Sequence, residues 1–284
     1  MPKHNFFIGA HFSVAGGFLQ AFKEAHSIGA SSMQIFTKSP MMAKLRQVTK
    51  EEAALIKSWK DRKEIKSLVI HASYLLNLAK KIDPNQFAMK SLVEDLENAE
   101  KMEAEGVVLH MGKSLKDDPM VAEKLFVENI EIALKMAKAS RAKVILENTA
   151  GQGSEMGYLI EDYARIFNKI KNQSRLGICL DTAHLFAAGY DLRQKEGATN
   201  FFNQYQKVLD WSSLAAIHFN DSKKALLSRV DRHEDIGQGH IGETGLKEFA
   251  LSLSKKRPGL GFVLETPQTS LSYLKQIEKI KGWN

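Results

Sequence analysis

The sequence is poor in cysteine and has no long apolar run. Its single cysteine, Cys179, excludes an intrachain disulfide and any metal site built from cysteine thiolates. That residue lies within the run GICLD, which predicts inert packing in the core. No stretch approaches the roughly 20 apolar residues that a membrane-spanning helix needs, so we expect no membrane association.

Linkers and low-complexity segments are also absent. The chain has only six prolines among 284 residues, and no Pro-rich or Ser-rich stretch divides it, so we expect one domain over residues 1–284. The first residues superficially match a signal peptide, but His11 and Ser13 interrupt the apolar run, and the segment is needed as a first strand. We therefore expect an intracellular, cytoplasmic protein.

Composition and charge point to a folded protein with an anionic partner. The chain is 44% hydrophobic and 26% charged, which is typical of soluble globular proteins and not of disorder. The formal net charge is +7, which favours partners such as nucleic acid through attraction to phosphates.

Seven of eight short apolar runs end in, or run straight into, a side chain that can bind a metal. They are IGAH, LVIH, VVLH, VILE, ICLD, AAIH and FVLE, which end at His11, His71, His110, Glu147, Asp181, His218 and Glu265. Only MQIFT, residues 33–37, does not. One apolar strand that ends in histidine means little, whereas seven of eight indicate a shared site.

Segments of helical period separate these runs, and this alternation is typical of a parallel sheet built from βαβ units. The expected helices span residues 16–29, 51–63, 85–105, 121–139, 158–170, 200–209, 245–253 and 270–281. Eight strands and eight helices predict an α/β protein of the (β/α)8 TIM-barrel class. In such a barrel the carboxyl ends of all strands converge on one face, where we expect the active site.

Two further motifs add donors on the long loops. His184 follows Asp181 by three residues, and His233 follows Asp231 by two. The candidate metal ligands are therefore His71, His110, Glu147, Asp181, His184, His218, Asp231, His233 and Glu265. Nine donors are too many for one ion and predict a cluster of two or three.

The donor types indicate which metal and which chemistry. Imidazole and carboxylate without thiolate fit zinc, which we favour, and also manganese, cobalt or iron. Four clustered carboxylates without cations would repel one another. Paired divalent ions activate water for attack on phosphorus and bind the attacking and leaving oxygens, so phosphate ester hydrolysis is the expected reaction.

Three long motifs carry a resemblance to a known family. The segments VILENTAGQG, GICLDTAHLFAAGYD and HFNDSKKALLSRVDRHEDIGQGHIG resemble the endonuclease IV family of apurinic/apyrimidinic (AP) endonucleases, and the similarity extends from IGAHFSVAGG to VLETP. The resemblance implies a barrel with three zinc ions. It implies His71, His110 and Glu147 at the first ion, with Glu147 bridging to a second ion completed by Asp181, His218 and Glu265. The third would be held by His184, Asp231 and His233.

The resemblance also implies the reaction and the DNA contacts. Such enzymes hydrolyse the phosphodiester 5′ to an abasic site in duplex DNA, leave a 3′ hydroxyl and a 5′ deoxyribose phosphate, and clean blocked 3′ ends. Glu147 and Glu265 would have a catalytic role as well as a ligand role. Tyr74 and Leu75 match the pair that inserts into the base stack. Met41 stands where the family commonly has an arginine, and methionine cannot hydrogen-bond a base edge or a phosphate. This departure puts in doubt whether the affinity for DNA and the preferred lesion match those of the family.

Basic residues near the expected mouth of the barrel are candidate phosphate contacts. They are Lys38, Lys223, Lys224, Arg229 and Arg232. We expect a monomer, because the mouth must admit bent duplex DNA.

Two rival functions remain open. A metal-dependent sugar isomerase or epimerase can use the same barrel, although such enzymes use fewer metals, and the third ligand group favours the nuclease. A non-catalytic DNA-damage binding protein is the other, but loss of chemistry leaves no reason to retain four clustered carboxylates.

Overall fold

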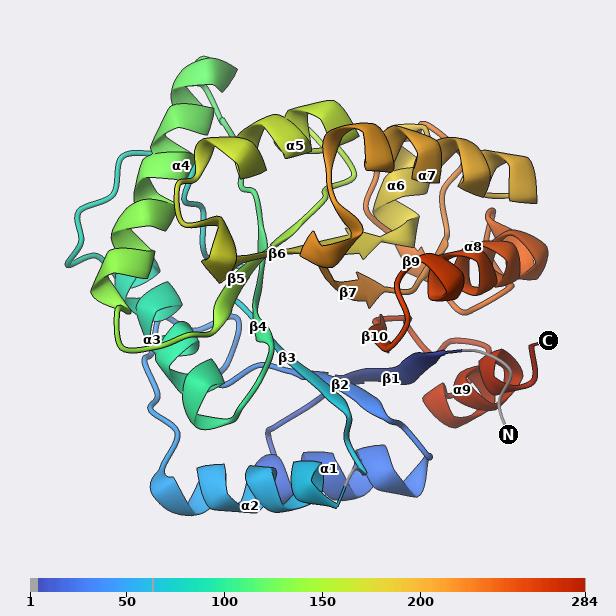
Figure 1. Cartoon of the computed structure of the whole chain (residues 1–284), viewed down its shortest axis with the longest axis horizontal. Helices are drawn as coiled ribbons and strands as arrows, with labels where there is room; N and C mark the ends of the chain where they lie inside the picture. The colour runs from blue at the N-terminus through green and yellow to red at the C-terminus, as the bar shows by residue number, and fades with distance from the viewer. Residues whose placement is uncertain (1–4, 63, 284) are drawn as a thin grey trace.

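A closed barrel of eight parallel strands forms the centre of the structure, a computed structural model that describes residues 5–62 and 64–283 (Figure 1). The strands follow one another around the barrel in the order β1-β10-β7-β6-β5-β4-β3-β2. Their bounds are β1 Phe6–Phe12, β2 Ser32–Ile35, β3 Ser67–His71, β4 Gly106–His110, β5 Lys143–Glu147, β6 Leu176–Asp181, β7 Leu214–His218 and β10 Leu260–Leu264. The predicted (β/α)8 class is confirmed.

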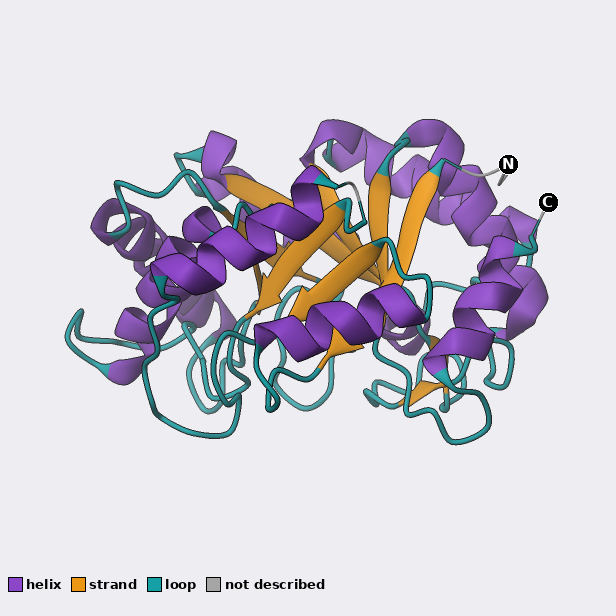
Figure 2. Ribbon diagram, turned by 90° about the horizontal axis from the view of Figure 1, so that it is seen from below, coloured by secondary structure: helices purple, strands orange, loops and turns teal. Residues whose placement is uncertain are grey.

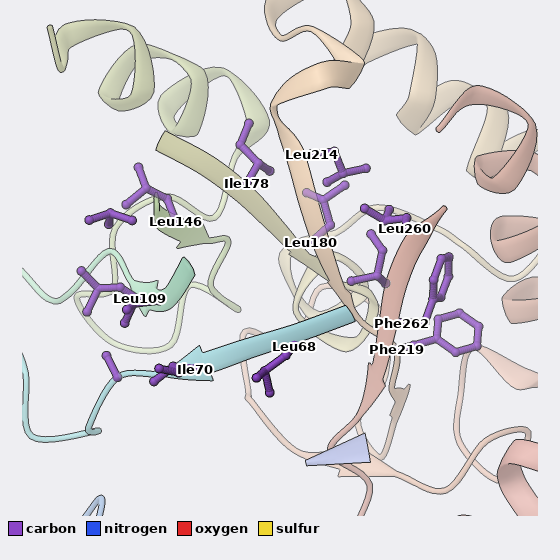
Figure 3. Close-up of a cluster of buried hydrophobic side chains, with 14 of the residues drawn as sticks. Leu68, Ile70, Leu109, Leu146, Ile178, Leu180, Leu214, Phe219, Leu260 and Phe262 are labelled. Carbon is purple, nitrogen blue, oxygen red and sulfur yellow. The ribbon is translucent and has the colours of Figure 1, made fainter. Parts of the chain in front are cut away.

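The strands alternate between two buried faces, because successive side chains of a strand point to opposite sides. One set, which includes Leu68, Ile70, Leu109 and Leu146, packs in the large cluster between sheet and helices (Figure 3). The other set forms a small separate cluster inside the barrel, made of Val69, Val108, Ile145, Cys179, Ala216 and Val263. Cys179 is thus part of the inner packing and is fully buried.

Helices surround the barrel and bury one face each against it (Figure 1). Their bounds are α1 Phe18–Ser27, α2 Lys50–Asp61, α3 Phe87–Lys101, α4 Pro119–Met136, α5 Ile160–Lys169, α6 Thr182–Ala188, α7 Lys195–Val208, α8 Gly242–Lys256 and α9 Tyr273–Lys281. Two short 3-10 helices, Gln173–Arg175 and Trp211–Ser213, precede β6 and β7. The predicted helices lie at these places, with ends that differ by several residues.

Capping interactions explain where several helices begin. Thr49 and Glu52 form a reciprocal capping box at the start of α2, and Asp118 caps α4 ahead of Pro119. Helix α6 was not predicted. It begins at once after β6 because the Asp181 carboxylate accepts from the backbone N–H of His184 at 2.8 Å, and it ends at Gly189, whose φ of 115° suits glycine.

The long loops gather where the strand arrows point, at the carboxyl ends of the strands (Figure 2). A small antiparallel hairpin of β8 (Asp221–Ser222) and β9 (His233–Glu234) rises from the loop that follows β7. Within the described residues, none of the helices combines the length and the apolar character that a bilayer crossing requires.

Candidate metal centre

The candidate ligands lie in one ring at the carboxyl end of the barrel. Each of His71, His110, Glu147, Asp181, His218 and Glu265 stands two residues after a member of the inner cluster, so all six point into the barrel directly above that cluster. Strand register aligns them, since His110 pairs with Glu147 and Asp181 with His218. The structure therefore brings together side chains that lie up to 194 positions apart in the chain, from residue 71 to residue 265.

The potential ligand atoms form three groups, and within each group all the atoms lie within 4.8 Å of one another. The first is His71, His110 and Glu147; the second is Glu147, Asp181, His218 and Glu265; the third contains Asp181, His184 and His233. Asp231 joins the third group, because its Oδ1 is 3.2 Å from His184 Nε2 and 3.4 Å from His233 Nε2. Glu147 is shared by the first two groups, in line with the bridging role that the resemblance implies for it. Asp181 is shared by the last two groups, which the sequence analysis did not anticipate.

Backbone carbonyls fix which imidazole nitrogen faces the cluster. The Nδ1 atoms of His71, His184 and His233 donate to the carbonyl oxygens of Ala72, Asn148 and Glu265 at 2.7, 2.9 and 3.2 Å. Their Nε2 atoms are thereby left as acceptors that point inward, the arrangement that metal-binding histidines use.

Unpaired buried atoms test whether a cation fits. In the described part of the chain, Nε2 of His184, Nε2 of His233 and Oε2 of Glu147 are buried without a hydrogen bond of good geometry, although each faces a nitrogen or oxygen of another candidate ligand at 3.0 to 3.4 Å. Buried polar atoms left unpaired are rare in folded proteins and call for an ion or another explanation. Since all three belong to the ligand groups, the residues present fit bound metal ions.

The electrostatics of the cluster also demand positive charge. Burial raises the pKa of Glu147, but His218 and His110 outweigh that effect and hold the pKa of Glu147 well below its ordinary value. Burial lowers the pKa of His184, yet Asp181 and Asp231 raise it well above the usual range. Divalent ions would supply the same positive charge in place of imidazolium protons.

Two further side chains belong to the ring: Gln34, which the sequence analysis did not identify, and His11, which it noted only as the end of an apolar run. His11 and Gln34, from β1 and β2, complete the ring so that each barrel strand contributes one side chain. Gln34 Nε2 donates to Glu265 Oε1 at 2.6 Å, and Gln34 Oε1 lies 2.8 Å from His218 Nε2. Gln34 therefore orients two ligands, but the run MQIFT, which contains it, was set apart because it ends in no His or carboxylate. His11 ended a run, yet its ring lies 3.5 Å from Glu265 and 3.0 Å from Gln34 without joining a ligand group.

Two buried asparagines support the ligands from behind. Asn220 donates to Asp181 Oδ2 at 2.7 Å and accepts from the backbone N–H of Glu265 at 2.8 Å. Asn148 accepts from the backbone N–H of Asp181 at 2.8 Å. Asn148 comes one residue after Glu147, and Asn220 comes two residues after His218. Their closeness to strand-end ligands is the signal in the sequence that could have identified them.

Two cavities open beside the cluster and meet at Tyr74. One, of about 630 Å³, is bordered by His11, Phe36 and Glu265, and the other, of about 450 Å³, by His71, His110 and Asp231. Tyr74 lines both and is 57% exposed, next to Leu75 at 46%. An aromatic and an apolar side chain thus stand free at the entrance of the site.

Five of the candidate DNA-contact residues besides Tyr74 and Leu75 are exposed at the mouth. They are Met41, Lys223, Lys224, Arg229 and Arg232. Arg229 lies over the ring of Tyr158 at 4.4 Å, which limits its freedom.

Lys38 is a correction to the expectation from sequence. Its side chain is only 5% exposed, and its Nζ lies 2.7 Å from Asp95 and 3.2 Å from Glu94. A buried ammonium paired with two carboxylates offers no free charge to a phosphate. Lys38 therefore does not belong with the exposed basic residues.

Comparisons with known proteins find similar proteins over nearly the whole length of this chain. Residues 22–283 match the sequence model of the family described as xylose isomerase-like TIM barrel. The chain is 36% identical over 265 residues to a probable endonuclease 4 of Halothermothrix orenii, covering 93% of this chain and 94% of the relative. It is 35% identical over 270 residues to a probable endonuclease 4 of Chloroflexus aurantiacus, covering 94% and 92%.

Solved structures agree with this result. Endonuclease IV from Thermus thermophilus superposes with a TM-score of 0.84 at 32% identity, over 98% of both chains. A D-tagatose 3-epimerase-like protein superposes with a TM-score of 0.72 at 18% identity, over 97% of this chain and 96% of that one, which shows the shared fold alone.

Proposed function

The chain belongs to the endonuclease IV family of DNA-repair nucleases, and from that premise we propose that it hydrolyses the phosphodiester 5′ to an abasic site in duplex DNA. The products are a 3′ hydroxyl and a 5′ deoxyribose phosphate, and removal of blocked 3′ ends is a related activity of the same site. The observation that carries the proposal is the set of nine imidazoles and carboxylates that meet in three groups at the open end of the barrel.

We propose zinc at all three groups. His71, His110 and Glu147 would hold one ion, with Glu147 shared with a second group of Asp181, His218 and Glu265. His184, Asp231 and His233 would hold the third. When bound, such ions lower the pKa of water and neutralise charge on the phosphate.

The two glutamates have the further task of orienting the attacking water. Glu147 is fully buried, and its Oε1 lies 2.8 Å from His218 Nδ1, which is also 3.2 Å from Glu265 Oε2. Both carboxylates therefore face the same imidazole, Glu147 from the end of β5 and Glu265 from the residue after β10. A water held between them has its lone pair directed away from both, toward a phosphate that enters from the mouth.

Exposed side chains around the mouth are suited to bind distorted duplex. Tyr74 and Leu75 stand where they can fill the gap left by a nucleotide flipped out of the stack, a movement that costs least at a damaged position. Met41 can fill space in the same way but cannot donate a hydrogen bond. Lys223, Arg229 and Arg232 supply positive charge for phosphates. We propose that the protein acts as a monomer.

A sugar isomerase or epimerase is the competing interpretation of the fold. The third ligand group argues against it, because Asp231 and His233 come from the β8–β9 hairpin region rather than from strand ends and extend the cluster beyond one small-molecule site. No observation in the described residues specifically favours the competing function.

Incision of an end-labelled duplex with one abasic-site analogue tests the proposal. We expect cleavage 5′ to the analogue that disappears after metal stripping and returns with zinc. An undamaged duplex of the same sequence is the control. Intact abasic DNA in the presence of protein with confirmed bound metal would contradict the proposal and favour the isomerase.

A further inference from the structure

The loop between β2 and α2 has an exposed apolar tip and no regular structure of its own. Met41 is 70% exposed and Met42 57%. An irregular segment of this kind is mobile unless its two ends are fixed by specific contacts. The contacts of Thr37 and Lys38 at one end, and of Arg46 and Val48 at the other, therefore decide how the tip is presented.

One face of α3 receives both ends of this loop. Ser91, Glu94, Asp95 and Asn98 are spaced at 0, 3, 4 and 7 residues, so they share a single face of the helix, and all four are buried. We call this set the α3 brace. It is polar, although a buried helix face is usually apolar.

Lys38 and Thr37 hold the first end of the loop on the α3 brace. Lys38 Nζ donates to Asp95 Oδ1 at 2.7 Å, to Glu94 Oε1 at 3.2 Å and to the carbonyl oxygen of Ser91 at 3.3 Å. Thr37 Oγ1 donates to the same Asp95 oxygen at 2.6 Å. This end of the loop is therefore fixed by a buried ionic network.

Backbone groups hold the second end. The Arg46 N–H donates to Glu94 Oε1 at 2.7 Å, and the Val48 N–H donates to Asn98 Oδ1 at 2.9 Å. Asn98 Nδ2 in turn donates to the Arg46 carbonyl oxygen at 2.8 Å. Glu94 thus contacts both ends of the loop, and Asn98 makes two hydrogen bonds to the second end, one as acceptor and one as donor.

A contact outside the α3 brace connects this loop to its neighbour at the mouth. Ser73 Oγ donates to the Pro40 carbonyl oxygen at 2.6 Å, immediately before the exposed Tyr74. The β3–α3 loop that carries Tyr74 leads into α3 itself. Both apolar tips are consequently positioned relative to one helix.

A buried ion pair is weak evidence for stability, because desolvation offsets most of the attraction, but it defines a specific geometry. Lys38, Glu94 and Asp95 have side-chain exposures of 5%, 7% and 1%. If these three residues only stabilised the fold, apolar residues of the same volume would serve equally well. The ionic network at this place therefore suits the task of fixing the loop in one position.

From these contacts we propose that Lys38 is a positioning residue, which with Asn98 and the rest of the α3 brace holds the Met41 loop preformed for duplex DNA. The proposal rests on the proposed function for the identity of the ligand. A loop that is already ordered loses less conformational entropy on binding, so the brace contributes to DNA affinity rather than to the chemical step.

Two variants test the proposal in the full-length, metal-loaded protein. Asn98→Ala removes the two side-chain hydrogen bonds to the second end of the loop without changing any charge. Lys38→Met removes the ammonium group at the first end. Lys169→Met is the matched control, because it also removes one positive charge from a buried carboxylate, Glu123, with which Lys169 forms a 2.6 Å pair on the outer helices. Hydrogen–deuterium exchange over residues 39–48, the Kd for a duplex with an abasic-site analogue, and kcat at saturating DNA are measured for each.

In both brace variants we expect faster hydrogen–deuterium exchange over residues 39–48 and a Kd about tenfold higher. We expect kcat to change by no more than about twofold. The control should match the wild type in all three. If Lys38→Met fails to fold, Asn98→Ala decides alone. Faster exchange with unchanged Kd, or unchanged exchange, overturns the proposal. Wild-type protein that neither binds nor incises abasic DNA would instead overturn the proposed function, and the exchange data would still show whether the brace orders the loop.

Discussion

Replacement of Glu265 by glutamine separates catalysis from folding and DNA binding. Glutamine has nearly the same shape, and the position keeps its contact with Gln34, whose Nε2 is 2.6 Å from Glu265 Oε1. The change removes one negative charge from a site where the second group of ligand atoms lies within 4.8 Å. We therefore expect an intact fold, nearly unchanged affinity for abasic DNA, and a large loss of turnover.

The size of that loss follows from Coulomb's law. Two unit charges about 4 Å apart interact by about 4 kcal/mol at an effective dielectric constant of about 20. A barrier higher by that amount corresponds to a rate about a thousandfold lower. Loss of the ion from the weakened group would reduce turnover further.

Three measurements check this prediction. Turnover is measured with the end-labelled abasic duplex, affinity by fluorescence anisotropy, and metal content by elemental analysis. Glu128→Gln is the control, because Glu128 is exposed on α4 and has only a 3.9 Å pair with Lys124. Wild-type turnover in Glu265→Gln would refute the assignment of Glu265 to the cluster and to orientation of the attacking water.

Three further predictions concern the metals and the Met41 loop. Removing bound metal should lower the Tm by about 8 to 16 °C, because an ion at a thousand times its Kd adds about 4 kcal/mol to the free energy of unfolding; a Tm that chelation leaves unchanged would argue against a structural cluster. Stripping should be faster at about pH 5.5 than at about pH 8, because imidazole ligands such as His184, whose pKa is raised by Asp181 and Asp231 despite burial, take up protons that compete with the ions. Met41→Arg should tighten DNA binding and steepen its salt dependence by about 0.9 in log–log slope, whereas the control Met136→Arg on α4 should not; equal slopes would remove this loop from the interface.

The fold and the meeting of the strand-end ligand candidates could be predicted from the sequence, because each depends on the periodicity of the strands and helices. A residue two positions after an inward-facing apolar residue also faces inward, so His71 above Val69 and Glu265 above Val263 could be expected to meet. Sharing of Asp181 between two groups could not be predicted, because it depends on where α6 begins and how the loop after β7 folds back.

The supporting residues were harder to predict because they act through hydrogen bonds. Gln34 and Asn220 carry no charge and bind no metal by preference, yet each contacts two parts of the cluster. Lys38 shows the opposite error. A lysine next to an exposed loop was expected to face DNA, but Glu94 and Asp95, more than 50 positions later in the sequence, draw its ammonium into the interior.

The third ligand group depends on a loop, while the first two depend on the barrel. His71 and His218 are held by strands and are nearly or fully buried, whereas the side chain of Asp231 is 36% exposed. That loop is itself ordered by the buried carboxylate of Asp221, which accepts hydrogen bonds from the backbone N–H groups of Ser222, Gly237, Gly239, Ile241 and Gly242. A barrel with the same strands but a different loop after β7 would retain the first two groups and lose the third. The loop after β7, rather than the barrel, therefore decides whether the third ligand group forms.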